Sequence, residues 1–95
     1  MAAYFIASVT SHDDGWVADY QANVPPMVER FGGELICRSN QFERFEGEGA
    51  APHYTVIIRF PAMADVQAFM ACPDYAPFKV ARIAGATSDI FAVAD

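Results

Sequence analysis

The segment Ala3–Thr10 constrains the fold more than any other part of the chain. Its residues alternate with period two, and both faces are largely apolar, with Tyr4 and Ile6 on one and Phe5 and Val9 on the other. Alternation of this kind is typical of a β-strand. A strand that is apolar on both sides is expected to be covered on both sides. We therefore predict a central strand of a sheet with a cover on each face.

The longest periodic segment follows and predicts an amphipathic helix. At 100° per residue, seven apolar residues fall within about 120° of one another, namely Trp16, Val17, Tyr20, Val24, Met27, Val28 and Phe31. Pro25 and Pro26 lie outside this stripe, although prolines disrupt helices. We expect one helix, kinked at the prolines and ended by Gly32-Gly33, with two separate helices as the alternative. Ser11, Asp13 or Asp14 can cap its start.

The next two segments predict a β-hairpin. Glu34–Glu46 is expected to form a long strand, bent by a bulge at Ser39-Asn40. His53–Phe60 alternates cleanly and places Tyr54, Val56, Ile58 and Phe60 on one face. A short glycine-containing loop, GEGAAP, would join the two strands.

The last third of the chain predicts two helices and a closing strand. Pro61 opens the first helix and Cys72-Pro73 stops it. Asp74 can cap a short second helix, on which Tyr75, Phe78 and Arg82 share one face. Asp89–Ala94 is expected to close the sheet.

The order of these elements is β-α-β-β-α-β, and it predicts a single α+β domain over residues 1–95. Right-handed crossovers in this order give a ferredoxin-like, four-stranded antiparallel sheet with its helices on one face. The other face is left bare over roughly 400 Å² in projection. Because monomers seldom expose an apolar patch of this size, we expect a second copy to cover it, which makes the protein a homodimer.

Composition narrows the partners and the compartment. The chain is 54% hydrophobic and 14% aromatic, which is rich for 95 residues, and its net charge is −6. That charge repels nucleic acid and anionic membranes. No apolar run approaches the roughly 20 residues of a membrane span. The start of the chain does not have the pattern of a signal peptide. Two cysteines, Cys37 and Cys72, then indicate free thiols, expected as small buried hydrophobes in the cytoplasm.

Three stretches resemble a known family. They are FGGELICRSNQFERFEG, VIIRFPAMADVQAFM and CPDYAPFKVARIA, and with the order of elements they are similar to the domain-of-unknown-function family numbered 1330. The most specific pieces are the Gly-Gly before a strand arginine, Glu46-Gly47, Phe60-Pro61 and Asp74-Tyr75 with a later cation. At Cys72 the family usually has serine. The resemblance spans about Ala3 to Val93 and implies the dimeric α/β-barrel superfamily, without implying a reaction.

Four residues are candidates for a ligand site. Arg38 follows an apolar run and shares a face with Ile36 by alternation, where a guanidinium requires a carboxylate from the protein or from a ligand. Tyr20 lies in the helix stripe, where most aromatic residues are core. Tyr75 and Arg82 share a helical face and can grip a carboxylate or enolate. The alternative for this pair is a tyrosine that packs the helix and an arginine in solvent.

Neither a metal nor a cofactor is predicted. His12 and His53 lie far apart at turns and lack the spacing of metal ligands. No P-loop, Rossmann glycine pattern or nucleophile elbow is present. The haem-degrading branch of the superfamily needs a histidine on the second helix, and Ala62–Met70 contains none.

Three classes of function remain open. The first is a domain that binds a small acidic or aromatic molecule, such as a carboxylate or a quinone-like compound, between sheet and helices. The second is a cofactor-independent enzyme, because the superfamily includes monooxygenases and isomerases. The third is a structural or regulatory dimer without a pocket. Within the first class we expect Arg38 to hold the anion, while Arg44 lies beyond the bend on an exposed ribbon.

Overall fold

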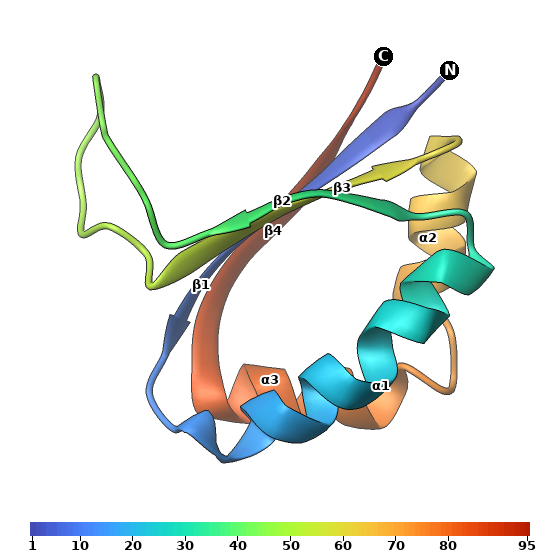
Figure 1. The fold of residues 1–95 in the computed structure, drawn as a ribbon, viewed down its shortest axis with the longest axis horizontal. Coiled ribbons are helices and arrows are strands. Elements are labelled where there is room, and N and C mark those ends of the chain that lie inside the picture. The colour runs from blue at the N-terminus through green and yellow to red at the C-terminus, as the bar shows by residue number, and fades with distance from the viewer.

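The computed structural model describes all residues from 1 to 95. Four antiparallel strands form one sheet in the order β2-β3-β1-β4, and they comprise β1 (Ala3–Ser11), β2 (Glu34–Ser39), β3 (Tyr54–Phe60) and β4 (Ala86–Ala94). The helices all lie on one side of this sheet (Figure 1), and they comprise α1 (Val17–Arg30), α2 (Met63–Met70) and α3 (Ala76–Gly85). The predicted ferredoxin-like βαββαβ fold is confirmed.

Strand β1 lies between β3 and β4, so its predicted central position is confirmed. Phe5, Ala7 and Val9 are buried beneath the helices, and they belong to the hydrophobic core. On the opposite face Tyr4, Ile6 and Ser8 are only half-buried. The register places nine residues on this open face, which are Tyr4, Ile6, Ser8, Thr55, Ile57, Arg59, Asp89, Phe91 and Val93. Helices therefore cover one of the two faces.

Helix α1 is a single helix that contains both prolines, as predicted, and it bends along its length in Figure 1. It continues from a 3-10 turn at Asp14–Trp16, where the carboxylate of Asp13 accepts a hydrogen bond from the Gly15 amide at 3.0 Å. At the other end Gly32 has φ +81°, a conformation that favours glycine. The Gly32 amide donates to the carbonyl of Glu29 at 2.9 Å, so the predicted glycine stop is confirmed.

The predicted long strand Glu34–Glu46 is wrong, because β2 ends at Ser39. Residues 40–53 instead form an irregular arm that extends away from the sheet (Figure 1). A strand needs a partner, and the returning half of this arm cannot supply one: Gly47 and Gly49 have φ of +102° and +105°, and Pro52 has no amide donor. The connection to β3 is therefore much longer than the predicted hairpin loop.

The bulge in β2 lies at Ile36, not at Ser39-Asn40 as predicted. Leu35 pairs with Ile58 and Cys37 pairs with Ile57, so one residue of β2 has no partner in β3. An extra residue of this kind reverses the alternation of the strand beyond it.

Asp74 does not cap α3, contrary to the prediction. No side-chain hydrogen bond caps this helix. Asp74 instead forms the one salt bridge of the structure, with Arg30 of α1 at 3.2 Å. The same guanidinium donates to the Sγ of Cys72 at 3.6 Å. Strand β4 also begins earlier than predicted, at Ala86 directly after α3.

Both cysteines are free thiols. Cys72 is half-buried against the core, whereas Cys37 is exposed, so the expectation that it is a small buried hydrophobe is wrong. The helices of the structure lack the combination of length and apolar character that a bilayer crossing requires.

Candidate functional site

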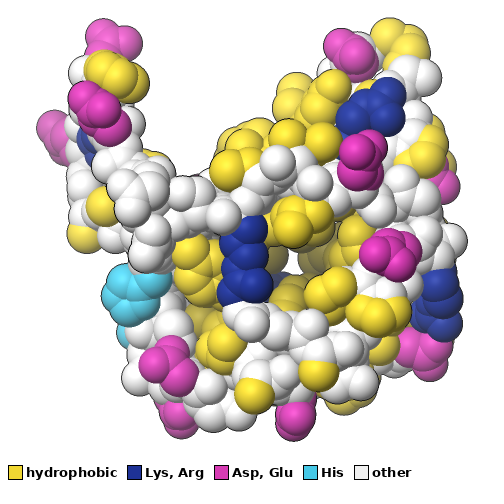
Figure 2. Space-filling view, in the orientation of Figure 1, with side chains coloured by type: hydrophobic (Ala, Val, Ile, Leu, Met, Phe, Trp, Pro, Cys, Tyr) yellow, Lys and Arg dark blue, Asp and Glu magenta, His cyan; other side chains and the backbone are white.

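A cavity of about 260 Å³ lies between the sheet and the helices. Figure 2 shows it as a hollow with hydrophobic walls and cationic atoms at its centre. Twenty residues line it, and 14 of them are hydrophobic. Six lining side chains carry a polar group, and the two tyrosines among them also count as hydrophobic: Tyr20, Gln21, Glu29, Arg38, Tyr54 and Arg82. Three of the four residues singled out from the sequence thus meet in one cavity.

Arg82 reaches the cavity from α3 and is only 5% exposed. Its Nε has no hydrogen-bond partner, and no carboxylate lies within salt-bridge distance, because the one salt bridge joins Arg30 to Asp74. The alternative of an arginine in solvent is therefore wrong. A buried charge without a counter-ion is costly, several kcal/mol in effective terms. The site thus carries a positive charge that the protein itself does not neutralise.

Arg38 reaches the same cavity from β2, and the bulge is the reason. Arg38 pairs with Val56 and Leu35 pairs with Ile58, and all four residues line the cavity. Leu35 and Arg38 are three positions apart, so in a regular strand they would face opposite sides. Arg38 therefore shares a face with Leu35 and not, as predicted, with Ile36.

The guanidinium of Arg38 already has partners. In the amide orientation that satisfies both side chains, Oε1 of Gln21 accepts hydrogen bonds from Nη1 of Arg38 at 3.1 Å and from Nη2. The guanidinium also lies 5.4 Å from the ring centroid of Tyr54, within the range of a cation–π contact. Arg38 is exposed, so its charge costs less free energy than that of Arg82.

Tyr20 and Tyr75 form a hydrogen-bonded pair behind these cations. Their hydroxyl oxygens are 2.7 Å apart, and their rings meet edge to face. Tyr20 lines the cavity, whereas Tyr75 is fully buried and lies behind it. Burial raises the pKa of Tyr20 well above its usual range, Tyr75 adds to the rise, and Arg82 opposes it. Tyr20 is therefore a neutral phenol at physiological pH.

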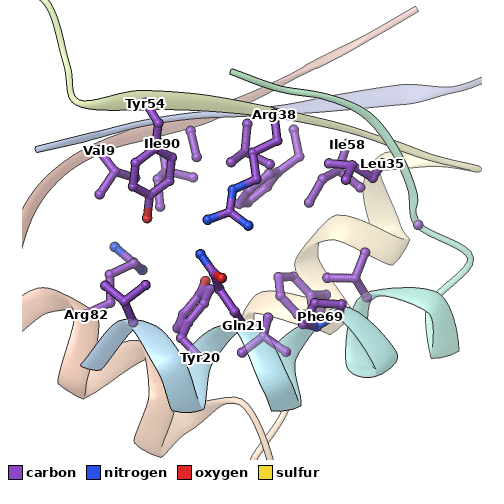
Figure 3. A pocket seen from close by; sticks show the side chains of 18 of the residues that line it. Val9, Tyr20, Gln21, Leu35, Arg38, Tyr54, Ile58, Phe69, Arg82 and Ile90 are labelled. Atoms are coloured by element: carbon purple, nitrogen blue, oxygen red, sulfur yellow. The ribbon is translucent and has the colours of Figure 1, made fainter. Parts of the chain in front are cut away.

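The cavity has a polar part and an apolar part (Figure 3). Arg38 and Tyr54 project from the sheet toward Arg82, Tyr20 and Gln21 on the helices. The far end is bounded by Leu35, Ile58 and Phe69. Burial also raises the pKa of Tyr54, and Arg38 and then Arg82 oppose this rise. Guanidinium and phenol donors thus gather at one part of an otherwise apolar space, which suits an anion with an apolar body.

Sequence reasoning did not single out Gln21 or Tyr54 as site residues. The alternation of His53–Phe60 predicts the face of β3 on which Tyr54 lies, but the contact of Tyr54 with Arg38 depends on the bulge. Gln21 follows Tyr20 at the rim of the helix stripe, and no sequence pattern distinguishes it from a solvated glutamine.

Neither histidine takes part in the cavity. The Nε2 of His12 lies 2.6 Å from the hydroxyl of Thr87, and the Nδ1 of His53 accepts the Ser11 amide at 3.1 Å. No group of three or more histidine, cysteine or acidic side chains is placed to hold a metal ion.

Several solved structures resemble this fold. RPA0582 from Rhodopseudomonas palustris, a protein of unknown function, matches with a TM-score of 0.81 at 16% identity over 97% of this chain and 80% of its own. SnoaB from Streptomyces nogalater, a cofactor-independent oxygenase, matches with a TM-score of 0.69 at 18% identity over 99% and 92%. Rv0793 from Mycobacterium tuberculosis matches with a TM-score of 0.56 at 12% identity over 100% and 95%.

These likenesses show that the chain shares the fold of these proteins, an α+β fold with βαββαβ order and a four-stranded antiparallel sheet. No curated protein matches the sequence. The model of one family, the domain of unknown function DUF1330, matches residues 2–95. The chain therefore belongs to the DUF1330 family.

Proposed function

We propose that this protein binds a small organic acid in the cavity between its sheet and its helices. The observation that carries the proposal is the buried guanidinium of Arg82, which has no carboxylate partner in the protein. An anionic ligand would supply that partner, and the resulting charge-assisted hydrogen bonds are about twice as strong as neutral ones. In this proposal Arg82 is the main residue that binds the anion, a role that the sequence predicts for Arg38.

The remaining lining residues define the ligand further. A volume of about 260 Å³ lies just below the roughly 300–1,000 Å³ typical of small-molecule sites. It suits a single aromatic ring or a short aliphatic chain with an acidic group. The acidic group would lie among Arg82, Tyr20 and Arg38, and the apolar body would extend toward Phe69.

A thermal-shift screen against aromatic carboxylates, aliphatic carboxylates and quinones tests this proposal. A ligand that binds only the folded state raises the melting temperature, and the rise grows with the logarithm of the ligand concentration above its Kd. We expect carboxylates to raise it and their uncharged amides to leave it almost unchanged. If no acid shifts the melting temperature at millimolar concentration, the proposal is wrong.

A cofactor-independent enzyme is the second candidate function. Phenol and guanidinium donors at one part of an apolar cavity can stabilise an enolate or another oxyanion, and SnoaB, an oxygenase, shares the fold. However, the lining contains neither histidine nor cysteine, and its one carboxylate, Glu29, is exposed. Binding is therefore favoured over catalysis. Turnover of any ligand found in the screen, without an added cofactor, would reverse this order.

Arg38 and Arg44 are expected to differ in their effects on binding. Arg38→Met should weaken carboxylate-induced stabilisation and leave the fold intact, because Arg38 lies at the cavity with only Gln21 and the Tyr54 ring as partners. Arg44 lies over Phe42 on the exposed arm and forms no ion pair. Arg44→Ala should therefore be nearly silent, within about 0–1 kcal/mol. Melting curves with and without ligand measure both effects. Unfolding of Arg38→Met would make Arg38 a structural residue.

We also propose that the open face of the sheet packs against the same face of a second copy. Phe91 is 54% exposed there and pairs across the sheet with Ile6, which in turn pairs with Ile57. We expect about 800 Å² to be buried on each partner.

Light scattering at micromolar concentration should report twice the mass of the 10.4 kDa chain. Phe91→Asp should yield a monomer. Val80→Asp, on the exposed side of α3, is the matched control and should remain dimeric. A monomeric wild-type protein would contradict the proposal.

A further inference from the structure

The two hydroxyls of the Tyr20–Tyr75 pair have different surroundings. Tyr75 is 0% exposed, and its ring lies against that of Phe69 with centroids 4.5 Å apart. Its hydroxyl has one hydrogen-bond partner, the hydroxyl of Tyr20 at 2.7 Å. Tyr20 lines the cavity and lies beside Arg82. The hydroxyl of Tyr75 therefore has a single hydrogen-bond partner, whereas the hydroxyl of Tyr20 can also reach a ligand in the cavity.

These surroundings determine which hydroxyl donates. If Tyr20 donated to Tyr75, the proton of Tyr75 would be buried without an acceptor, which costs about 1–3 kcal/mol. If Tyr75 donates, its proton is satisfied, and the proton of Tyr20 is free to turn into the cavity. Buried polar groups are almost always hydrogen-bonded, so the second arrangement is the stable one.

We propose that Tyr75 sets the hydrogen-bond polarity of the site: it donates to Tyr20, which turns its own proton into the cavity toward a ligand oxygen that only accepts. This inference rests on the proposed function. Tyr20 is then a binding residue, and Tyr75 is a positioning residue that does not touch the ligand.

This polarity narrows the class of ligand. Tyr20 and Arg82 face the ligand as donors, and an arginine side chain has no acceptor atom. An ionised carboxylate has two oxygens that only accept, so it satisfies both residues. The amide of the same acid offers an NH₂ group in place of one oxygen, and that group would face a donor. Burial raises the pKa of Tyr20, so Tyr20 keeps its proton across the neutral range. The site should therefore select an acid over its amide.

Titration calorimetry with benzoate and benzamide tests this inference on wild-type protein, Tyr75→Phe and Tyr4→Phe. Wild-type protein should prefer benzoate. In Tyr75→Phe the Tyr20 hydroxyl loses its fixed donor and can turn either way, so the ratio of benzoate to benzamide affinity should fall about tenfold. Tyr4 is a half-buried tyrosine on the open face, away from the cavity. Tyr4→Phe is thus the matched control and should keep the wild-type ratio.

The outcomes separate this inference from the proposed function. If benzoate binds and Tyr75→Phe keeps the wild-type ratio, Tyr75 does not set the polarity, and the proposed function stands. If neither benzoate nor any other acid of the thermal-shift screen binds wild-type protein, both fail. Circular dichroism shows whether Tyr75→Phe is folded. If it is not, Tyr20→Phe removes the proposed donor itself, and an unchanged ratio in that variant overturns the inference.

Discussion

Arg82→Met is expected to abolish stabilisation by carboxylate ligands and to leave the unliganded protein at least as stable as wild type. The side chain is 5% exposed and has no counter-ion, so the unliganded fold bears the cost of a buried charge. Methionine keeps most of the apolar stem and removes that charge. If the loss of a binding residue stabilises the unliganded protein, the charge of that residue is compensated only when a ligand is bound.

The ligand-dependent part of this effect is large. A ligand at 100 times its Kd stabilises the folded state by about 2.7 kcal/mol, which corresponds to roughly 10–20 °C in melting temperature for a domain of this size. Arg82→Met should lose this entire shift. Arg44→Met makes the same change on the exposed arm and should keep it. A marked loss of stability in unliganded Arg82→Met would instead show that the guanidinium is part of the structural core.

The parts of the fold that followed from sequence are those with strong local periodicity. The stripe from Trp16 to Phe31 predicted α1 through two prolines, because the apolar phase continues across them and every stripe residue packs in or against the core. The alternation of Ala3–Thr10 predicted the central strand for the same reason. In both segments the spacing of apolar residues follows from burial of one face of a single continuous element, so the spacing can be read from the sequence alone.

The end of β2 and its bulge could not be predicted in the same way. A bulge exists only relative to a partner strand, and the register that shifts between Leu35 and Cys37 is set by β3. The length of a strand likewise depends on the strand that pairs with it. Residues beyond Ser39 have suitable side chains for a strand, but no strand lies opposite them.

The candidate site was partly predicted, and the missing parts are those that depend on contacts between layers. Tyr20, Arg38 and Arg82 were singled out as candidates, and all three line the cavity. The sequence could place Arg82 on the face of α3 that it shares with Tyr75. It could not show that no carboxylate faces Arg82, because that depends on which side chains the sheet and α1 bring opposite it.

Phe69→Ala is expected to destabilise the fold by about 3–5 kcal/mol, the usual cost of removing a buried aromatic ring. Phe69 is 1% exposed, and its ring packs against the rings of Phe5, Phe31, Phe60 and Tyr75. It thus joins α2 to the sheet, to the end of α1 and to the segment before α3. Domains of this kind are stable by only about 5–15 kcal/mol, so much of the total would be lost.

Urea denaturation followed by circular dichroism measures this loss as a shift in the midpoint. Phe45→Ala is the matched control, because Phe45 is 85% exposed on the arm and its removal should cost less than about 0.5 kcal/mol. Phe69 also forms the apolar end of the cavity. Phe69→Ala should therefore enlarge the cavity, whereas Phe69→Leu keeps more of the side-chain volume. Phe69→Leu is expected to fall between wild type and alanine in stability. Equal midpoints for Phe69→Ala and Phe45→Ala would mean that the aromatic cluster does not hold α2 to the sheet.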